Sequence, residues 1–466
     1  MSIKTFQNKI VKPIRIIQFG EGKFLRAFWE EYIDDGNASG QYDGAILIVK
    51  PRKGGNIDDF RQQDCMYTLV TRGIKDGEIV DQKKIITSVD SVIQCDENVN
   101  AFLELATLDS LEVIVSNTTE AGICVNIKDD FSDIAGQSYP GKLTRLLFER
   151  YEKYGDAQNE ELVILPLELN DKNGELLKNA VTEYIKIWGL SKGFKHWVET
   201  SVIFCNTLVD RIVSGYLDIE LPYEDKLIDV CEPYKLFAIE TRVPEKVKKK
   251  LPLLNMNSSV VISDNIDVYR ERKVKVLNGV HTAVSLAAYN AGFIYVEQMM
   301  NDEVFSCFID KIIYDEILTT INMETDKLIV YAEEIKQRFK NPFLYHRLKD
   351  ISMNSISKFK VRVLPTMIDY KSEHGVYPKG LMFSLAALLY FYKNGIINKQ
   401  YTIVDSTEVI EVFSKWDGKN IRHILSNEIL WGEFTETIKE MSDDTTNNMK
   451  LIHEYGIKGA MKIICK

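Results

Sequence analysis

Two patterns of apolar and polar residues divide the chain. Up to about residue 265, short apolar runs alternate with segments of helical period, and the clearest runs cover residues 14–19, 45–49, 111–115, 161–167, 201–206 and 235–240. Strands that alternate with helices predict an α/β fold with a mostly parallel, doubly wound sheet. Two further runs, 67–70 and 78–80, flank Lys75-Asp-Gly77 and predict a β-hairpin.

After about residue 265, helical periodicity dominates and β-branched alternation is scarce. The segments 303–321, 325–339, 379–393, 406–416, 421–431 and a last one ending at 464 predict helices. We therefore expect an α/β domain over residues 1–265 and a mostly α-helical domain over 266–466. The apolar run 381–392 is too short to span a bilayer and is typical of a core helix.

A glycine motif stands between the first predicted strand and the next helix. Gly20-Glu-Gly-Lys-Phe follows residues 14–19 directly, and a helical pattern then continues to Tyr32. Gly20 allows a tight turn, and Gly22 lets the backbone approach a pyrophosphate at the helix N-terminus. This favours a dinucleotide-binding Rossmann-like domain. Leu25 replaces the third glycine of the usual fingerprint, so a plain turn is the alternative.

The end of the second predicted strand leaves the choice of dinucleotide open. An acidic residue normally binds the adenosine ribose there, whereas this chain has Lys50-Pro-Arg-Lys53. These basic residues could meet the 2′-phosphate of NADP, or the loop could simply be exposed.

One predicted helix after residue 273 is apolar on almost all sides yet carries Lys273, Asn278 and His281. Polar groups on a buried helix rarely lack a partner or a role. At about 100° per residue, Asn278 lies at about 140° and His281 at about 80° from Lys273, so all three share one side. They form a candidate site. Alternatively, Lys273 ends the helix in solvent and His281 is a satisfied core histidine.

Composition narrows the function further. A net charge of −10 argues against general nucleic-acid or anionic-membrane binding. Seven scattered cysteines without Cys-x-x-Cys suit a reducing cytoplasm, and six histidines without ligand spacing predict no metal site. The N-terminus has no signal-like apolar core, and the basic run 246–250 is expected to be a solvated linker. We expect a cytoplasmic protein with a small-molecule substrate; its oligomeric state is left open.

These motifs resemble a known family. Lys273-x4-Asn278-x2-His281 resembles the signature of the polyol-specific long-chain dehydrogenases, the mannitol dehydrogenase family, and Gly20-x-Gly-x-Phe-x-Arg-Ala27 resembles its nucleotide loop. Phe24-Leu-Arg-Ala-Phe28 and the loop 116–122 are similar to the tagaturonate-reducing branch. The resemblance implies metal-independent, NAD-linked, reversible reduction of D-tagaturonate to D-altronate in hexuronate catabolism.

The resemblance also implies residue roles. Lys273 would be the acid/base, assisted by Asn278 and His281 at the oxyanion. Asp210 would face the active centre, although it could instead cap a helix. NAD would lie against residues from the glycine loop and from the loop after the strand 111–115: Phe19, Gly20, Glu21, Gly22, Phe24, Arg26, Asn117 and Thr119.

Two points of the resemblance are incomplete. Leu169 stands where the family has an oxyanion-binding asparagine, which Asn170 or Asn173 could replace. A substrate carboxylate needs a cation, and Lys358, Lys360 and Arg362 are candidates, with Lys358 the first choice and Arg362 the second; the alternative is a solvated basic face.

Three functions follow from these observations. The leading interpretation is a tagaturonate-type reductase. A fructuronate or mannitol-type dehydrogenase of the same family is the alternative among enzymes. A dinucleotide-binding redox sensor without catalysis is the alternative from another class, although such a sensor need not keep Lys273, Asn278 and His281.

Overall fold

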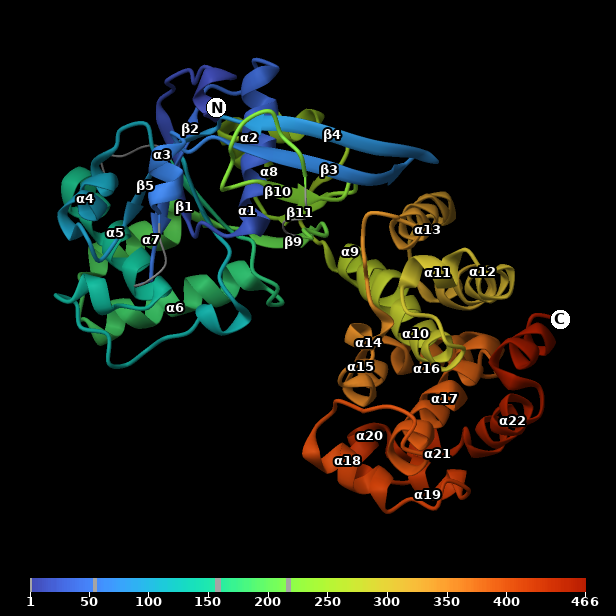
Figure 1. Ribbon diagram of the computed structural model, residues 1–466. Helices are drawn as coiled ribbons and strands as arrows, with labels where there is room; N and C mark the ends of the chain where they lie inside the picture. The colour runs from blue at the N-terminus through green and yellow to red at the C-terminus, as the bar shows by residue number, and fades with distance from the viewer. Residues whose placement is uncertain (1, 53–56, 156–160, 215–218) are drawn as a thin grey trace. The chain divides into compact units, whose positions relative to one another are not determined.

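The computed structural model describes residues 2–52, 57–155, 161–214 and 219–466 (Figure 1). The chain divides into two compact units. Unit 1 comprises Met1–Arg72 and Ile79–Ile266, and unit 2 comprises Gly73–Glu78 and Asp267–Lys466.

Unit 1 is built on a six-stranded sheet with the order β5-β2-β1-β6-β7-β8. Every neighbouring pair runs parallel. Apolar residues of the central strands alternate between two core clusters, one on each face, as a covered parallel sheet requires. The predicted Rossmann-like sheet is confirmed. Its strands are β1 (Ile14–Phe19), β2 (Ala45–Lys50), β5 (Val89–Gln94), β6 (Val113–Ser116), β7 (Leu162–Pro166) and β8 (Val202–Phe204).

Two three-stranded sheets complete the strands of unit 1. One contains β10 (Asp229–Cys231), β3 (Tyr67–Lys75) and β4 (Glu78–Ile86), and the other contains β12 (Val260–Ser263), β11 (Leu236–Glu240) and β9 (Asn206–Asp210). The predicted hairpin is confirmed: Asp76 and Gly77 join β3 to β4 with φ angles of 53° and 81°. Two successive positive φ angles match the twist of a tight hairpin turn.

The helices of unit 1 follow the predicted alternation with two differences. They are α1 (Lys23–Arg26), α2 (Trp29–Ala38), α3 (Asp58–Gln62), α4 (Val99–Glu104), α5 (Tyr139–Tyr154), α6 (Asn173–Ile187), α7 (Lys192–Ser201) and α8 (Pro244–Lys250).

The first difference concerns the helix after the glycine motif. The expected continuous helix is broken, because Phe28 adopts φ −131° and ψ −74° between α1 and α2. The second concerns residues 246–250, where the predicted solvated linker is wrong. These residues belong to α8, and Lys250 is buried with its Nζ 3.8 Å from Glu112 Oε1.

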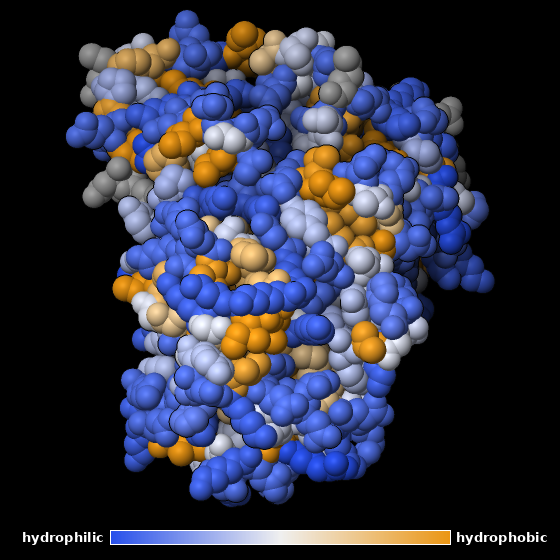
Figure 2. Space-filling model, turned by 90° about the vertical axis from the view of Figure 1, so that its right-hand side faces the viewer, coloured by the Kyte–Doolittle hydropathy of each residue, from blue (hydrophilic) through white to orange (hydrophobic). Residues whose placement is uncertain are grey.

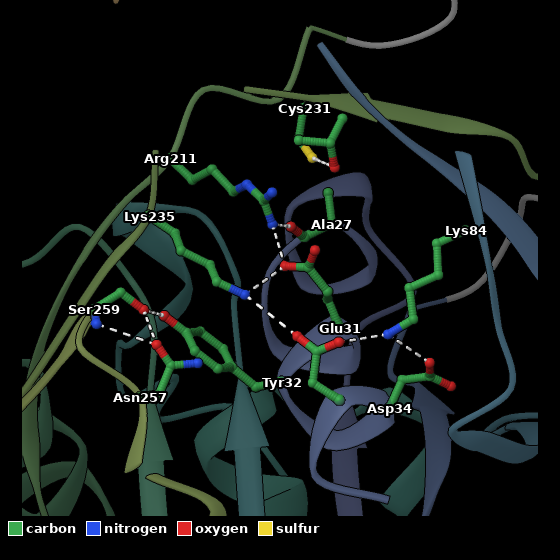
Figure 3. Close-up of polar contacts among 12 residues, drawn as sticks. Ala27, Glu31, Tyr32, Asp34, Lys84, Arg211, Cys231, Lys235, Asn257 and Ser259 are labelled. Atoms are coloured by element: carbon green, nitrogen blue, oxygen red, sulfur yellow. Dashed lines mark hydrogen bonds and ion pairs between the residues drawn. The ribbon is translucent and has the colours of Figure 1, made fainter. Parts of the chain in front are cut away.

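Salt bridges around α2 tie the later strands to the glycine-loop side of the sheet (Figure 3). Glu31 accepts from Arg211 at 2.5 Å and from Lys235 at 2.8 Å. Lys84 on β4 pairs with Asp34 at 2.8 Å and with Asp35 at 2.5 Å. The acidic side chains Glu31, Asp34 and Asp35 of this helix are therefore paired with cations from other elements.

Unit 2 is helical, as the change of pattern predicted, and its helices run in chain order from the domain boundary to the C-terminus. They are α9 (Asp267–Arg272), α10 (Val280–Asn290), α11 (Val296–Met300), α12 (Glu303–Asp310), α13 (Thr325–Phe339), α14 (Leu348–Ile351), α15 (Ser355–Arg362), α16 (Leu364–His374), α17 (Lys379–Tyr392), α18 (Thr407–Ser414), α19 (Ile421–Leu425), α20 (Glu428–Trp431), α21 (Thr435–Lys439) and α22 (Ser442–Ile464).

Helix α17 is the core of unit 2. It packs against α10 and α22, and nearly all its residues are buried. Residues 379–397 form the one helical segment of the described chain that is long and apolar enough to cross a membrane, but 78% of its most apolar window is buried inside the protein. Figure 2 shows a face on which hydrophilic residues predominate and hydrophobic ones form small, separate groups. The predicted core helix is confirmed.

Candidate active site

The glycine loop of unit 1 has the backbone form that the motif predicts. Gly20 has a φ of +113°, which only glycine adopts readily, and its N–H donates to Val49 O at 3.0 Å. Leu25 Cδ1 lies 3.5 Å from where a Cβ of Gly20 would be, so this buried leucine fills the space that the third glycine would leave open. A Cβ at Gly22 would meet no atom within 4 Å. The backbone at Gly22 is thus open to a phosphate group, and the loop fits a dinucleotide.

Two of the predicted cofactor residues pack their side chains against the core of unit 1. Phe19 packs against Phe102 and Tyr139. Phe24 stacks on Phe28 with ring centroids 5.0 Å apart. These ring contacts hold the loop on the side that faces the core, so the loop backbone is the part that a ligand could contact.

Arg26 also has internal partners. Its guanidinium donates to Leu227 O, lies 3.7 Å from Asp229 Oδ2, and covers the ring of Tyr67. It is 6% exposed. Arg26 therefore anchors α1 to the strand β10, and its predicted contact with the cofactor gains no support from this geometry.

An ion pair occupies the place where the acidic residue was expected. Lys50, the last residue of β2, is 7% exposed and its Nζ lies 2.7 Å from Glu21 Oε1. Of the two alternatives left open for these basic residues, simple exposure does not hold for Lys50, whose charge is neutralised by Glu21 of the glycine loop. Arg52 is exposed, and Lys53 lies outside the described residues.

The loop after β6 is held by hydrogen bonds to a buried residue that the sequence analysis did not select. Glu168 is 2% exposed and accepts from Thr118 N at 2.9 Å and from Ser116 Oγ at 3.2 Å. Burial raises the pKa of Glu168, and these hydrogen bonds oppose that shift. Asn117 donates to Leu167 O at 2.6 Å, while Thr119 is exposed beside them. Only proximity in the fold, with no local motif, identifies Glu168.

The structure removes one substitute for the missing family asparagine. Asn173 is fully buried, donates to Pro166 O and Glu168 O at 2.9 Å each, and accepts from Thr207 N at 2.8 Å. Its amide holds the loop and is not available to a substrate. Asn170 stays the candidate. Leu169 itself is 68% exposed, and Asp210 is buried at the end of β9.

In unit 2, Lys273 and Asn278 lie on a π-helical turn, Lys273–Gly279, between α9 and α10. The expected α-helical angles do not hold there, because a π-turn bonds residue i to i+5. Asn278 lies five positions after Lys273. A π-helical turn holds more residues than an α-helical turn, so the angle between the two side chains around the helix axis is smaller than the predicted 140°. Asn278 O accepts from Thr282 Oγ1 at 2.8 Å. π-Turns of this kind are frequent at functional sites.

His281, the second residue of α10, lies among apolar side chains with cations nearby. It is 8% exposed, stacks on Phe339 at 3.9 Å between ring centroids, and meets the ring of His346 edge-on at 5.0 Å. Its Nε2 has no hydrogen-bond partner among the described residues. Burial lowers the pKa of His281 well below its ordinary value, and His346, Arg338, Arg362 and Lys358 add to this shift. The imidazole is therefore neutral at physiological pH.

The cations near His281 are Arg338 of α13 and Lys358 and Arg362 of α15, and sequence analysis found only those of α15. Lys358 and Arg362 are four residues apart and share a face of this helix, whereas the alternation first noted would have suited a strand. Burial lowers the pKa of both groups. Lys358 Nζ donates to Ile351 O at 3.0 Å. In the described part of the chain, no carboxylate pairs with either.

Gly279 sets the spacing between α15 and the π-turn. A Cβ at this position would lie 3.0 Å from Arg362 O and 3.3 Å from Val274 O. A glycine therefore allows the end of α15 to approach the turn that carries Lys273 and Asn278.

Among the described residues, no group of three or more His, Cys, Asp or Glu side chains could hold a metal ion.

A parallel sheet with a glycine loop after its first strand, followed by a helical unit with a lysine and an asparagine on one turn and a histidine in the next helix, is typical of the long-chain dehydrogenases with a Rossmann domain. Two sequence profiles agree. The Mannitol dehydrogenase Rossmann domain matches residues 14–253, and the Mannitol dehydrogenase C-terminal domain matches residues 265–452. The chain belongs to the mannitol dehydrogenase family.

Relatives named altronate oxidoreductase match nearly the whole chain. Altronate oxidoreductase from Bacillus subtilis (strain 168) is 38% identical over 467 residues, which cover 97% of this chain and 95% of the relative. Altronate oxidoreductase from Escherichia coli O7:K1 (strain IAI39 / ExPEC) is 36% identical over 471 residues, with 97% of each chain covered.

Solved structures share the fold at lower identity. Pseudomonas fluorescens mannitol 2-dehydrogenase, in a ternary complex with NAD and D-mannitol, superposes with a TM-score of 0.68 at 20% identity, covering 97% of this chain and 94% of the other. A D-sorbitol dehydrogenase in substrate-free form superposes with a TM-score of 0.80 at 19% identity, covering 96% and 95%. These likenesses confirm the architecture.

Proposed function

We propose that the protein is a tagaturonate reductase, or altronate oxidoreductase, which reduces D-tagaturonate to D-altronate with NADH and catalyses the reverse reaction with NAD. The observation that carries the proposal is the unpaired cationic face of α15, Lys358 and Arg362, beside His281. The relatives named altronate oxidoreductase support it over the full chain. As a soluble dehydrogenase using NADH, the protein would work in the cytoplasm.

The residues of unit 2 suit reduction of a ketone. When bound, the dinucleotide supplies the hydride, which adds to the carbonyl carbon. Lys273 donates the proton that the carbonyl oxygen takes up. Asn278 and His281 present N–H groups that stabilise negative charge on that oxygen as it develops. Because burial keeps His281 neutral, the imidazole acts as a hydrogen-bond donor and Lys273 as the proton carrier.

The substrate carboxylate distinguishes a uronate from mannitol or fructose. Arg362 is half-buried, so an ion pair with a carboxylate would be shielded from solvent. We assign the carboxylate to Arg362 and Lys358 together. Fructuronate carries the same carboxylate, and it stays the alternative substrate of the same site.

The cofactor assignment is NAD. Glu21 neutralises Lys50 at the end of β2, so this lysine has no free charge for a 2′-phosphate, and the carboxylate of Glu21 offers an acceptor for ribose hydroxyls. The open backbone at Gly22 suits the pyrophosphate. Asn117 and Thr119 lie on the loop after β6, where the sheet's ligand-binding edge is expected.

The deciding experiment compares three ketones. NADH oxidation is followed by absorbance with tagaturonate, fructuronate and fructose under the same conditions. We expect turnover with tagaturonate, less with fructuronate and little with fructose. Turnover with fructose alone would assign a mannitol-type enzyme, and no oxidation with any ketone would leave the non-catalytic sensor. EDTA should not change the rate, because Lys273 supplies the proton without a metal ion; inhibition by EDTA would contradict this.

A further inference from the structure

A cavity of about 710 Å³ in unit 2 lies outside the residues assigned to catalysis. Its size is within the range of small-molecule sites. It is lined by the end of α17 and the following turn, by the loop before α19, and by α22; the lining residues are Tyr390, Lys393, Gly418, Lys419, Ile421, Thr446, Met449, Lys450, His453 and Glu454. Neither Lys273, Asn278, His281 nor α15 contributes to it.

Helix α22 forms one wall with a regular face. Its five lining residues are spaced i, i+3, i+4, i+7 and i+8, which places them on a single side of the helix. Met449 supplies apolar surface, and Lys450 and His453 supply polar heads. This wall is therefore part of a regular helix and keeps its form without a ligand.

Gly418 lets a lysine cross the opposite wall. It has a φ of +71°, and a Cβ there would lie 3.2 Å from Lys393 Cε. The glycine thus allows the lysine stem to lie against the loop backbone. Lys393 is only partly exposed, so fewer rotamers are open to its ammonium group than to that of a surface lysine.

The positive charge in this cavity is not balanced by the protein. In the described part of the chain, Lys393, Lys419 and Lys450 form no ion pair. Other lysines of α21 and α22 do: Lys439 lies 3.0 Å from Glu436 and Lys458 lies 2.6 Å from Asp302. Lys419 and Lys450 are exposed, so these three lysines are distinguished by lining one cavity together.

The acidic groups nearby do not reverse this sign. Glu454 lines the cavity and accepts a hydrogen bond from the hydroxyl of Tyr455. Asp417, next to the glycine of the loop, accepts from the backbone N–H groups of Lys419 and Asn420 at 2.8 and 2.9 Å. Three lysines and a histidine therefore face one lining carboxylate and one that is used in a turn.

We propose that this cavity binds a phosphorylated small molecule with a ring system, of the nucleoside-phosphate class. Lys393, Lys419 and Lys450 bind the phosphate oxygens, because an ammonium group forms strong charge-assisted hydrogen bonds with them. Tyr390, Ile421 and Met449 contact the ring. Because the site shares no residue with the catalytic turn, the ligand binds together with substrate and dinucleotide.

The test uses ATP as the probe and isothermal titration calorimetry on the full-length protein saturated with NADH, which occupies the proposed dinucleotide site of unit 1. We expect ATP to bind the wild-type protein. The double variant Lys393→Gln/Lys450→Gln should bind at least about tenfold more weakly, since it loses two charge-assisted contacts. Neither side chain forms an ion pair with the residues that the structure describes, so thermal unfolding should be unchanged and would report any misfolding.

Two controls make the result specific. Lys415→Gln removes an exposed lysine just after α18 that does not line the cavity, and Lys358→Gln removes the proposed carboxylate site; both should bind ATP as the wild type does. No binding to the wild type at millimolar ATP, or equal binding by the double variant, would overturn the proposal. Tripolyphosphate should bind more weakly than ATP, and equal affinity would overturn the ring contact.

Discussion

The acidic side chains of α2 in unit 1 are paired with cations, whereas the cations of α15 in unit 2 form no ion pair among the described residues. In unit 1, Arg211, with 1% of its side chain exposed, meets Glu31 directly. Lys235 also pairs with Glu31, and Lys84 pairs with Asp35 one turn further along the helix (Figure 3). In unit 2, Lys358 and Arg362 lie near His281, and neither forms an ion pair with a carboxylate of the described residues.

The pKa shifts report this difference. Burial alone would raise the pKa of Glu31, but Arg211 and Lys235 lower it below its ordinary value, so the charged form is favoured. Burial and the charge of Arg362 lower the pKa of Lys358, and the charge of Asp405 opposes this shift only in part, so there the charged form is disfavoured. A balanced group of charges stabilises the fold, whereas an unbalanced one attracts an anionic ligand. The comparison thus assigns structure to one region and recognition to the other.

The largest expected effect is on chemistry in unit 2. Lys273→Ala should reduce kcat for tagaturonate by about 1,000-fold, because it removes the proton donor. The dissociation constant of NADH, measured by nicotinamide fluorescence, should not change. Near-normal turnover would remove Lys273 from the mechanism.

Lys275 supplies the matched control for that variant. It lies two residues further on, and its Nζ pairs with Glu271 at 2.7 Å and Asp369 at 2.8 Å. Lys275→Met should lower the melting temperature while leaving kcat of the folded enzyme much closer to the wild type. Equal losses of kcat in the two variants would show that charge at this turn, rather than proton transfer, is what matters.

A change in the balanced network should act on stability. Glu31→Gln leaves Arg211 buried without its carboxylate and should cost about 3 kcal/mol of unfolding free energy, measured by denaturant titration. Since the pKa of Glu31 is lowered in the fold, its contribution is present above the ordinary value of 4.5 and is lost as pH falls through the lowered value. The difference between wild type and variant should therefore shrink in acid. A change in KM without a loss of stability would contradict the comparison.

The unbalanced cations should show the reverse behaviour. Arg362→Met should raise KM for tagaturonate by about 30-fold, because one charged hydrogen bond to the carboxylate is lost, and should leave thermal stability unchanged or higher. Lys360→Met, on another face of the same helix, is the control and should leave KM unchanged. If Lys360→Met raises KM as much as Arg362→Met does, the assignment of the carboxylate to this face of α15 fails.

The smallest effect is expected at the pair between the glycine loop and β2. Glu21→Gln frees Lys50 and should improve the affinity for NADPH relative to NADH by about tenfold, as one unmasked ammonium meets the 2′-phosphate. Fluorescence titration with both dinucleotides measures the ratio directly, without turnover. An unchanged ratio with normal binding of both would reject the role of this pair, while loss of all dinucleotide binding would count against the function of unit 1.

Local patterns predicted much of this molecule. The apolar runs marked the strands of the sheet, Lys75-Asp-Gly77 marked the hairpin, and the glycine motif marked the turn after β1. These features depend on residues adjacent in sequence, where propensity and φ restrictions act directly.

The parts that were missed depend on tertiary contacts. The burial of Lys50 could not be predicted from its sequence neighbours because its partner, Glu21, lies 29 positions away. His346 lies beside His281 only through packing, and nothing in its sequence context marks it. The π-turn at Lys273–Gly279 has no sequence signature of its own, so the side-chain angles could not be derived from a helical wheel. Asn173 could be removed as a substrate ligand only once its buried partners were known.

The absent side chain at Gly279 has a consequence for how this enzyme could change its preference among sugars. Arg362 O, at the end of α15, lies close to the turn that carries Lys273 and Asn278, so the helix proposed to bind the carboxylate and the turn proposed to carry the acid/base are packed together. A mutation that shifts α15 would then also displace the proposed acid/base. Evolution or engineering towards neutral polyols would therefore have to alter both together, and single substitutions on α15 should trade specificity against rate.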